Sequence, residues 1–446
     1  MAFARTPAEL LQKIIAEYME DEAIFASPSH RLQHTVRLGL INRRLRAFTL
    51  SIPSIWQTIY LQWPIEAVEE YLRRAQYSGI SLYLDTFHGA DDQKKADAKR
   101  QSWAIILRDH MTAFESLDIH IRTAACGKAL SMALETPAPN LKTFHLDLGK
   151  FDITRKLFSL QAPNLQTVHL NTRLAWDLAP FTSLSSVTLT VCQENSRKIL
   201  AMLPTMDQLS ALSLTGTNNT TDIPFPRHPH SIVLPPCQIL KLKNMTSLST
   251  RRLMSTVDLP QLQALEINEI VAMSDLESVP TTIPDAFAAI SGPIVDPESL
   301  SIEIYHERVI IRTDGTPSIS YTSDWRFLSK PARGDQRILD TIAAMIDSVS
   351  NTLQVAYMYL ELPPPSMFDD LDLMILFFRV FRDYPLISTL ELSGHVDQAL
   401  FAIDAGGTLL DLSYLKLSNL VPGAMQIFRD MVENLQLRRG FELHIE

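Results

Sequence analysis

Apolar and polar residues alternate in short runs along much of this chain. In the stretch APNLKTFHLDL, the apolar positions Leu141, Phe144 and Leu146 are separated first by two residues and then by one. Successive side chains of an extended strand point to opposite sides, so Phe144 and Leu146 should face inward and His145 outward. The stretch APNLQTVHLN follows with the same pattern, and His169 takes the place of His145. Each stretch therefore predicts a short strand that is buried on one side.

This spacing recurs along the chain at a nearly constant interval. From the first copy to the seventh, the copies begin 27, 24, 19, 25, 28 and 25 residues apart. The pattern is the L-x-x-L-x-L signature of a leucine-rich repeat. One repeat cannot bury its inner side alone, so neighbouring repeats stack into a curved solenoid. We therefore predict an α/β fold, with an irregular leucine-rich-repeat solenoid over residues 113–446. The nine copies begin at Phe114, Leu141, Leu165, Leu184, Leu209, Cys237, Leu262, Ile387 and Leu412.

Helical patterns occupy the spaces between several strands. Apolar residues recur at three- and four-residue intervals in segments 195–204, 246–257, 371–385 and 422–437, which predicts helices on the outer side of the solenoid. Residues 272–336 break the period. They include the stretch SLSIEIYHERVIIRTDGTPSISYTS, which predicts a hairpin or meander that turns at TDGT. We interpret this segment as an insertion or an elaborated repeat.

A separate helical unit is predicted over residues 1–64. Thr6 and Pro7 suit the start of a helix whose apolar face comprises Leu10, Leu11, Ile14, Ile15 and Tyr18. A second helix should run through Val36, Leu40, Ile41 and Leu45, and Pro53 should end it before a buried strand. Residues 65–112 then predict connecting helices and a first strand.

The N-terminal unit resembles an F-box, and the chain is particularly similar to fungal F-box/leucine-rich-repeat proteins. The resemblance rests on the order P-x-E-L-L, then a helix that ends in a basic cluster, then PSIWQTIYL. It implies that the N-terminal helices bind a Skp-type adaptor, which joins a cullin–RING ubiquitin ligase, and that the repeats hold the protein to be ubiquitinated. The residues that match the adaptor-binding motif are Pro7, Leu10, Leu11, Ile14, Ile41, Arg43 and Leu45, and Pro53 and Trp56 match its end.

The same N-terminal residues allow a second interpretation. A solenoid needs its first apolar edge covered, and a small helical cap would do this without binding any adaptor. Leu10, Ile14, Ile41 and Trp56 would then be core residues of the cap. In that case the protein is a repeat-based binding scaffold with no link to ubiquitination.

The outward positions of the predicted strands form two columns of polar residues. Equivalent positions in adjacent strands lie about 4.8 Å apart, so each column should be a continuous strip on the concave face. We expect this face to bind the target protein, whose identity the sequence does not reveal. The first column comprises Asp118, His145, His169, Thr188, Ser213, Lys241 and Glu266, and the second comprises His120, Asp147, Asn171, Thr190, Thr215, Lys243 and Asn268.

Composition and charge exclude several classes of function. The net charge is −10 and no long basic run occurs, which argues against a nucleic-acid-binding protein. The longest apolar runs are too short for a membrane span, and the N-terminus lacks the apolar core of a secretory signal. Three cysteines, far apart in sequence, suit free thiols in a reducing compartment. These features predict a cytoplasmic or nuclear protein, or one found in both compartments.

Catalytic chemistry is not predicted. The sequence contains no G-x-S-x-G, P-loop, G-x-G-x-x-G or H-E-x-x-H motif. The HPH stretch at His228–His230 lies among prolines and suits a surface loop. His145 and His169 align in adjacent repeats, but no third metal ligand is evident beside them. We therefore expect a protein that is not an enzyme and that needs neither a metal nor another cofactor.

Overall fold

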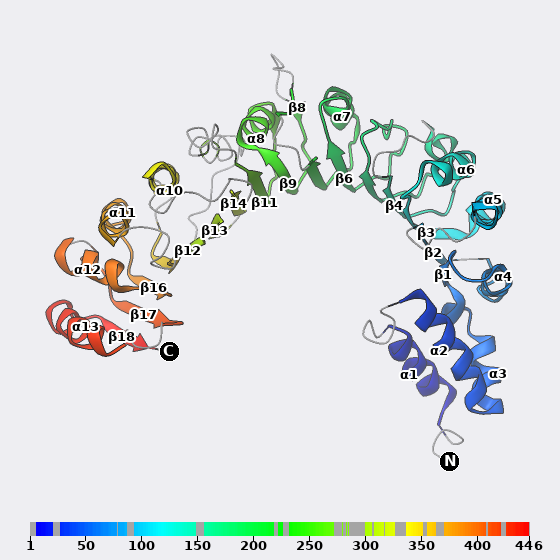
Figure 1. The fold of residues 1–446 in the computed structure, drawn as a ribbon, viewed down its shortest axis with the longest axis horizontal. Coiled ribbons are helices and arrows are strands. Elements are labelled where there is room, and N and C mark those ends of the chain that lie inside the picture. The colour runs from blue at the N-terminus through cyan, green and yellow to red at the C-terminus, as the bar shows by residue number, and fades with distance from the viewer. Residues whose placement is uncertain are drawn as a thin grey trace. The chain divides into compact units, whose positions relative to one another are not determined.

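Strands that follow one another along the chain are also neighbours in space over most of this protein. The computed structural model has a mixed α/β fold with one mostly parallel sheet of 16 strands and, among the described residues, twelve α-helices (Figure 1). The chain divides into two compact units, Met1–Leu189 and Thr190–Glu446. The structure describes residues 6–20, 27–77, 79–86, 93–148, 156–217, 222–225, 232–271, 279, 282, 284, 299–305, 307–315, 317–325, 336–350, 355–362, 370–406, 409–420 and 425–445.

The first unit begins with three helices rather than the predicted two. They are α1 (Ala8–Glu20), α2 (Pro28–Ile41) and α3 (Arg43–Ser51). The predicted helix through Val36 and Leu45 is wrong in its continuity, because Asn42 is extended, with φ −163° and ψ 165°. The Asn42 side chain accepts a hydrogen bond from the backbone N–H of Leu45 at 2.8 Å and so caps α3. A polar residue with strong capping preference thus divides one apolar pattern into two helices.

Two tryptophan side chains form hydrogen bonds between these helices and the segments that flank the first strand. Helix α3 ends before Pro53 as predicted, and the short helix η2 (Pro53–Trp56) leads into β1 (Thr58–Tyr60). Trp56 is buried and its indole N–H donates to the carbonyl of Thr49 at 3.0 Å. Trp63 donates in the same way to the carbonyl of Pro28 at 2.8 Å. The core position that one interpretation assigned to Trp56 is therefore confirmed.

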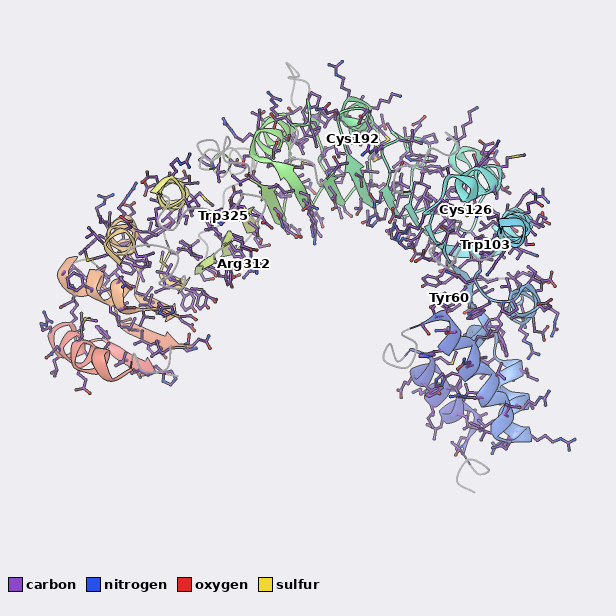
Figure 2. The ribbon with its side chains drawn as sticks, viewed as in Figure 1. Tyr60, Trp103, Cys126, Cys192, Arg312 and Trp325 are labelled. Carbon is purple, nitrogen blue, oxygen red and sulfur yellow. The ribbon has the colours of Figure 1, made fainter. Side chains whose placement is uncertain are left out.

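Six parallel strands follow in chain order. They are β1, β2 (Ile80–Asp85), β3 (Phe114–His120), β4 (Thr143–Asp147), β5 (Thr167–Asn171) and β6 (Ser186–Val191). Helices α4 (Ile65–Arg74), α5 (Gln93–His110) and α6 (Ala124–Leu134) lie along one side of these strands (Figure 1). Figure 2 shows Trp103 on α5, where its indole N–H donates to the carbonyl of Leu61 at 2.6 Å. The alternation predicted for β4 and β5 is confirmed, since Phe144, Leu146, Val168 and Leu170 are buried.

The repeated APNL stretches form the same turn before β4 and β5. The backbone N–H of Leu141 donates to the carbonyl of Ala138 at 3.2 Å, and Leu165 donates to Ala162 at the same distance. The asparagine of each stretch reaches back to the preceding repeat, where Asn140 donates to the carbonyl of Thr112 and Asn164 to that of Pro139, both at 2.7 Å. The repeated asparagine therefore ties each turn to the repeat before it. The same backbone turn recurs ahead of Leu184, Leu209, Cys237, Leu262 and Leu412.

The second unit continues the parallel pattern around an antiparallel centre. Its strand order is β7-β9-β11-β14-β13-β12-β15-β16-β17-β18. The meander predicted to turn at TDGT is confirmed, because β13 pairs antiparallel with both β12 and β14. The outer strands of the meander pair parallel with β15 and β11. The strand bounds are β7 (Ala211–Gly216), β9 (Ile239–Thr246), β11 (Ala264–Ile270), β12 (Ser299–Tyr305), β13 (Arg308–Asp314), β14 (Ser318–Asp324), β15 (Tyr357–Glu361), β16 (Thr389–Ser393), β17 (Tyr414–Ser418) and β18 (Glu442–Ile445).

Helices of the second unit lie along one side of its strands (Figure 1). Four were predicted from apolar periodicity and are confirmed as α7 (Ser196–Met202), α8 (Ser247–Met254), α11 (Asp370–Asp383) and α13 (Met425–Arg439). Two more, α10 (Gln336–Ser350) and α12 (Asp397–Gly406), lie between β14 and β15 and between β16 and β17. Among the described residues, none of the helices has both the length and the hydropathy needed to cross a membrane.

A carboxyl group is buried between helix α8 and strand β14. Glu269 on β11 is fully buried and accepts hydrogen bonds from the hydroxyl groups of Ser247, at 2.7 Å, and Tyr321, at 2.9 Å. Burial raises the pKa of Glu269 to about 7, although these hydrogen bonds oppose the shift. The group therefore exchanges its proton close to neutral pH.

The facing of strand β5 can be tested with one pair of variants. Val168→Asp puts a charge at a buried position of β5, so we expect the free energy of unfolding to fall by about 4 kcal/mol. Thr167→Asp, at a partly exposed position of the same strand, should cost less than about 1 kcal/mol. Denaturant melts followed by tryptophan fluorescence measure both losses. A larger loss in Thr167→Asp than in Val168→Asp would show that the strand faces the other way.

Glu269 should make the second unit less stable as the pH rises towards neutrality. The unfolded carboxyl ionises near 4.5, so between about pH 4.5 and 7 only the folded chain keeps this proton. Stability should therefore fall across that window, by on the order of 3 kcal/mol, and change little above it. Glu269→Gln should remove the dependence. Hydrogen exchange of peptides from β11 and β14 provides the measurement.

Glu266→Gln is the matched control on the same strand. Burial opposes ionisation of Glu266, but bonds from Lys243 and Lys241 outweigh it and hold its pKa below the usual value. This carboxyl is then ionised in both states from pH 5 to 8, so its replacement should leave the pH dependence unchanged. A dependence that persists in Glu269→Gln would contradict the assignment.

Candidate functional site

Polar side chains of the first unit gather on strands β3, β4 and β5. We name this surface the histidine face; it consists of Asp118, His120, His145, Asp147, His169 and Asn171. Strand pairing places Asp118 beside His145, His145 beside His169, and His120 beside Asp147. Thr188 on β6 continues the first of these rows. Within this unit the predicted columns therefore have the expected register.

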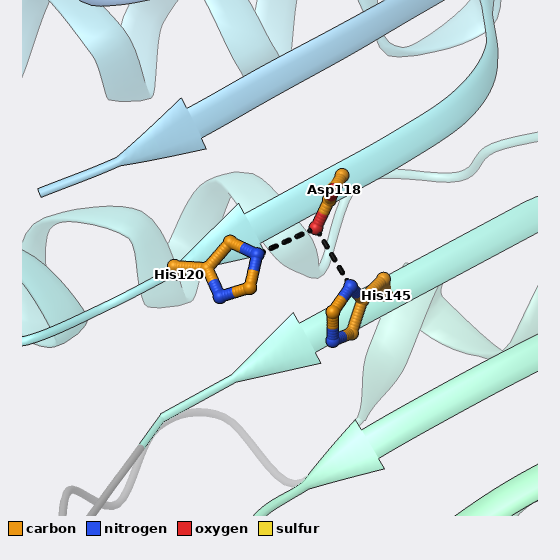
Figure 3. Close-up of side chains that lie close together, drawn as sticks. All are labelled: Asp118, His120 and His145. Atoms are coloured by element: carbon orange, nitrogen blue, oxygen red, sulfur yellow. Dashed lines mark ion pairs between the residues drawn. The ribbon is translucent and has the colours of Figure 1, made fainter. Parts of the chain in front are cut away.

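Two histidines converge on one carboxylate in the histidine face (Figure 3). The Oδ1 atom of Asp118 lies 2.8 Å from Nδ1 of His145 and 3.0 Å from Nε2 of His120. The ring centroids of His120 and His145 are 4.8 Å apart, and those of His145 and His169 are 4.3 Å apart. Alignment of the repeats in the sequence paired His145 with His169 and indicated no third metal ligand beside them. The structure instead groups His145 with Asp118 and His120.

Asp147 lies next to His120 and is held in place by neighbouring side chains. It was predicted as an outward contact residue, but it is only 8% exposed. Arg122 Nη1 donates to its carboxylate at 2.9 Å and Asn171 Nδ2 at 3.1 Å, while Nδ1 of His120 lies 3.5 Å from it. The expected accessibility of Asp147 is therefore wrong, because neighbouring side chains cover the carboxylate. Asp147 positions its neighbours rather than presenting a free surface.

Local charges determine the protonation of the histidine face. Burial opposes ionisation of Asp118, but His145 and His120 outweigh it and bring the pKa of Asp118 below its usual value. Partial burial lowers the pKa of His169, and the charge of His145 lowers it further. Near neutral pH the face therefore presents an ionised carboxylate beside an uncharged His169.

A second polar surface lies in the second unit, on β7, β9 and β11. Strand pairing places Ser213 beside Lys241, and Lys241 beside Glu266, as the first column predicted. Glu266 forms ion pairs with Nζ of Lys241 at 3.0 Å and with Nζ of Lys243 at 2.9 Å. The two lysines are therefore partly neutralised within the sheet. Thr190, the first residue of this unit, is half-buried at the end of β6.

The repeat pattern in the sequence did not predict a third polar surface, which lies on β12, β15 and β16. We name it the tyrosine–glutamate face; it consists of Glu303, Tyr305, Tyr357, Tyr359, Glu361 and Glu391. Its tyrosine hydroxyl groups donate to its carboxylates at 2.9–3.3 Å. Arg312 on β13, which is labelled in Figure 2, pairs with Glu303, and Lys416 pairs with Glu391. The signal was present, because Val355, Met358 and Leu360 follow the repeat spacing with methionine in a leucine position.

Apolar side chains are exposed on the N-terminal helices. Leu10 and Ile14 on α1 are 51% and 47% exposed, and Leu40 and Ile41 on α2 are 72% and 60% exposed. Arg44 donates to the carbonyl of Thr6 at 2.9 Å, which brings the start of α1 beside the α2–α3 junction. Of the other residues in the predicted adaptor-binding set, Pro7 and Arg43 are exposed, whereas Leu11 and Leu45 are buried.

Comparison with protein-family models and with curated protein sequences gives no match to this chain. Its function must therefore be argued from the surfaces above. The HPH stretch at His228–His230 lies outside the described residues.

The positioning role of Asp147 predicts an effect on stability. Asp147→Ala removes the acceptor for Arg122 and Asn171, so we expect the free energy of unfolding to fall by about 2 kcal/mol. Asp207→Ala, at an exposed position, should change it by less than about 0.5 kcal/mol. Thermal and denaturant melts measure both. No loss in Asp147→Ala would restore this residue to the accessible surface.

Proposed function

We propose that this protein is a non-enzymatic substrate-recognition subunit of a Skp/cullin/F-box-type ubiquitin ligase. In this proposal α1–α3 form an F-box-like unit that binds a Skp-type adaptor, and the strands belong to an irregular leucine-rich-repeat solenoid that binds the target protein. A repeat-based scaffold unconnected with ubiquitination is the alternative.

The observation that carries the proposal is the exposure of apolar residues on the N-terminal helices. Leu10, Ile14, Leu40 and Ile41 would be covered if these helices served only as a cap for the sheet. They are instead 47–72% exposed, while Leu11 on α1 and Leu38 on α2 are buried. Exposed apolar residues on small helices are typical of a surface that another protein covers.

The repeated turns support the solenoid assignment. The same backbone turn precedes strands in both units, and strands such as β5, β6 and β7 alternate buried and outward side chains. Helices connect many of the parallel strands and lie along one side of them (Figure 1). This is the arrangement expected when each repeat contributes one strand and an outer segment, and buries its inner side against the next repeat.

Target recognition is proposed for the outward side chains of the strands. The histidine face offers imidazole and amide groups, and the tyrosine–glutamate face offers hydroxyl and carboxylate groups. Tyrosine gives large contact area at low entropic cost, so it suits a protein-binding surface. A target that presents lysine or arginine side chains would complement the carboxylates of the second of these surfaces.

The adaptor proposal predicts a specific loss of binding. A variant with Leu10→Asp, Ile14→Asp and Leu40→Asp replaces exposed apolar contacts with charges, so we expect affinity for a purified Skp-type adaptor to fall at least about 100-fold. The fold should survive because all three positions face solvent. Surface plasmon resonance with the full chain measures the affinity. Leu11 is unsuitable for this purpose, because a charge at that buried position would disturb folding.

The matched control places the same charges on other exposed leucines. Leu371, Leu410 and Leu437 are 61%, 85% and 84% exposed, so changing all three to aspartate should leave adaptor affinity within about twofold of the original. Failure of the unmodified protein to bind the adaptor at micromolar concentration would overturn the proposal and favour the scaffold alternative.

A further inference from the structure

We propose that Asp118, His120 and His145 form a binding site for one divalent transition-metal ion, with Zn²⁺ as the ion that fits best. The site lies in the histidine face and does not depend on adaptor binding. The inference rests on the convergence of three donor atoms, on an unsatisfied carboxylate oxygen, on the rigidity of the strands and on the side chains that hold the donors.

Two of the three separations between the ligand atoms are already close to the required value. One atom from each of the three residues lies within 4.8 Å of the other two. The carboxylate oxygen is 2.8 Å and 3.0 Å from the two ring nitrogens (Figure 3). Ligands bound to Zn²⁺ at 2.0–2.2 Å in tetrahedral geometry are about 3.3 Å apart. Small side-chain rotations would therefore admit the ion without any change in the backbone.

The carboxylate oxygen between the histidines lacks a hydrogen bond of acceptable geometry. Oδ1 of Asp118 is buried, and although two ring nitrogens lie within 3.0 Å, neither is aligned to donate to it. A buried charged oxygen without a donor is costly. A cation between the three side chains would satisfy this oxygen and draw on the nitrogen lone pairs.

The strands hold the three donors on one face. Asp118 and His145 are paired neighbours on β3 and β4, and His120 follows Asp118 by two residues on the same strand. The intervening side chains, Ile119 on β3 and Leu146 on β4, are fully buried on the opposite face. The ligand side chains therefore cannot move to the other face without disrupting the core. Metal binding would then cost little conformational entropy, because the backbone that carries the ligands is already fixed.

A carboxylate lies behind one of the two histidines, in the place where metal-binding histidines usually have a supporting group. Nδ1 of His120 lies 3.5 Å from the carboxylate of Asp147 without an aligned hydrogen bond to it, and its Nε2 lies 3.0 Å from Oδ1 of Asp118. Arg122 and Asn171 fix that carboxylate by hydrogen bonds. A carboxylate behind a ligating imidazole orients the ring and strengthens the ligand. Asp147 is therefore a positioning residue of the proposed site.

The donor set selects the kind of ion. Two imidazoles and one carboxylate suit Zn²⁺ and its transition-metal neighbours, whereas Ca²⁺ and Mg²⁺ prefer sets made of oxygen alone. The three side chains are 26–29% exposed, so a fourth position is open to solvent or to a side chain of a bound protein. The competing explanation is that these contacts are only ion pairs between the carboxylate and the histidines.

Titration of the metal-free full chain with Zn²⁺ tests the proposal. Isothermal titration calorimetry should show one tight equivalent for the unmodified protein, and Co²⁺ should give the visible absorption of a low-symmetry site with nitrogen and oxygen ligands. His145→Gln and Asp118→Asn should each weaken Zn²⁺ at least about 100-fold, and Asp147→Asn about 10-fold. Ca²⁺ and Mg²⁺ at the same concentration should not compete.

Two controls separate this site from other histidines. His169→Gln changes a ring that contacts His145 but is outside the three-residue group, so Zn²⁺ affinity should stay within about threefold. A variant with His228→Ala and His230→Ala removes the HPH pair and should behave likewise. Circular dichroism establishes that each variant folds, and Zn²⁺ should raise the melting temperature of the unmodified protein but not of His145→Gln.

Two results would overturn the proposal. One is the absence of a stoichiometric Zn²⁺ equivalent in the folded unmodified protein. The other is an affinity that Asp118→Asn and His145→Gln leave unchanged, which would assign the contacts to ion pairs alone. Neither result bears on adaptor binding, which is measured without added metal.

Discussion

A short strand that buries every second side chain is not stable alone, and the whole sheet depends on this constraint. Phe144 and Leu146 on β4 are buried because β3 and β5 flank the strand, and because helical or looped segments cover the face of the sheet towards which these two side chains point. The same pairing aligns the outward side chains into rows. The hydrophobic requirement of the core therefore determines where the polar groups meet, including Asp118 and His145.

The sequence predicted features that repeat and features that follow from one residue type. The strand register, the turn at TDGT, the stop before Pro53 and four of the helices in the second unit were predictable, because periodicity and proline act locally. The break at Asn42 was not, since the apolar pattern continues across it and only the capping bond divides the helix. The strand containing Met358 was missed although Val355, Met358 and Leu360 keep the apolar spacing, because no copy of the pattern was counted between those beginning at Leu262 and Ile387.

The candidate sites were predictable only in part. The predicted columns placed His145 beside Asp118 and His169. The residue spacing does not determine which of these neighbours a side chain contacts, because that depends on its rotamer. His120 contacts Asp118, which lies two residues earlier on the same strand. Asp147 is covered by Arg122 from the loop after β3. The exposure of Leu40 depends on where α1 and α3 pack, and an apolar pattern alone would have placed it in a core.

The asparagines of the repeated turns have a consequence for how the chain is made. Asn140 and Asn164 donate to carbonyl groups that lie 28 and 25 residues earlier, and Ser183 donates to one 20 residues earlier. Every acceptor in this series therefore leaves the ribosome before its donor. A growing chain can therefore dock each new turn on structure that has already emerged.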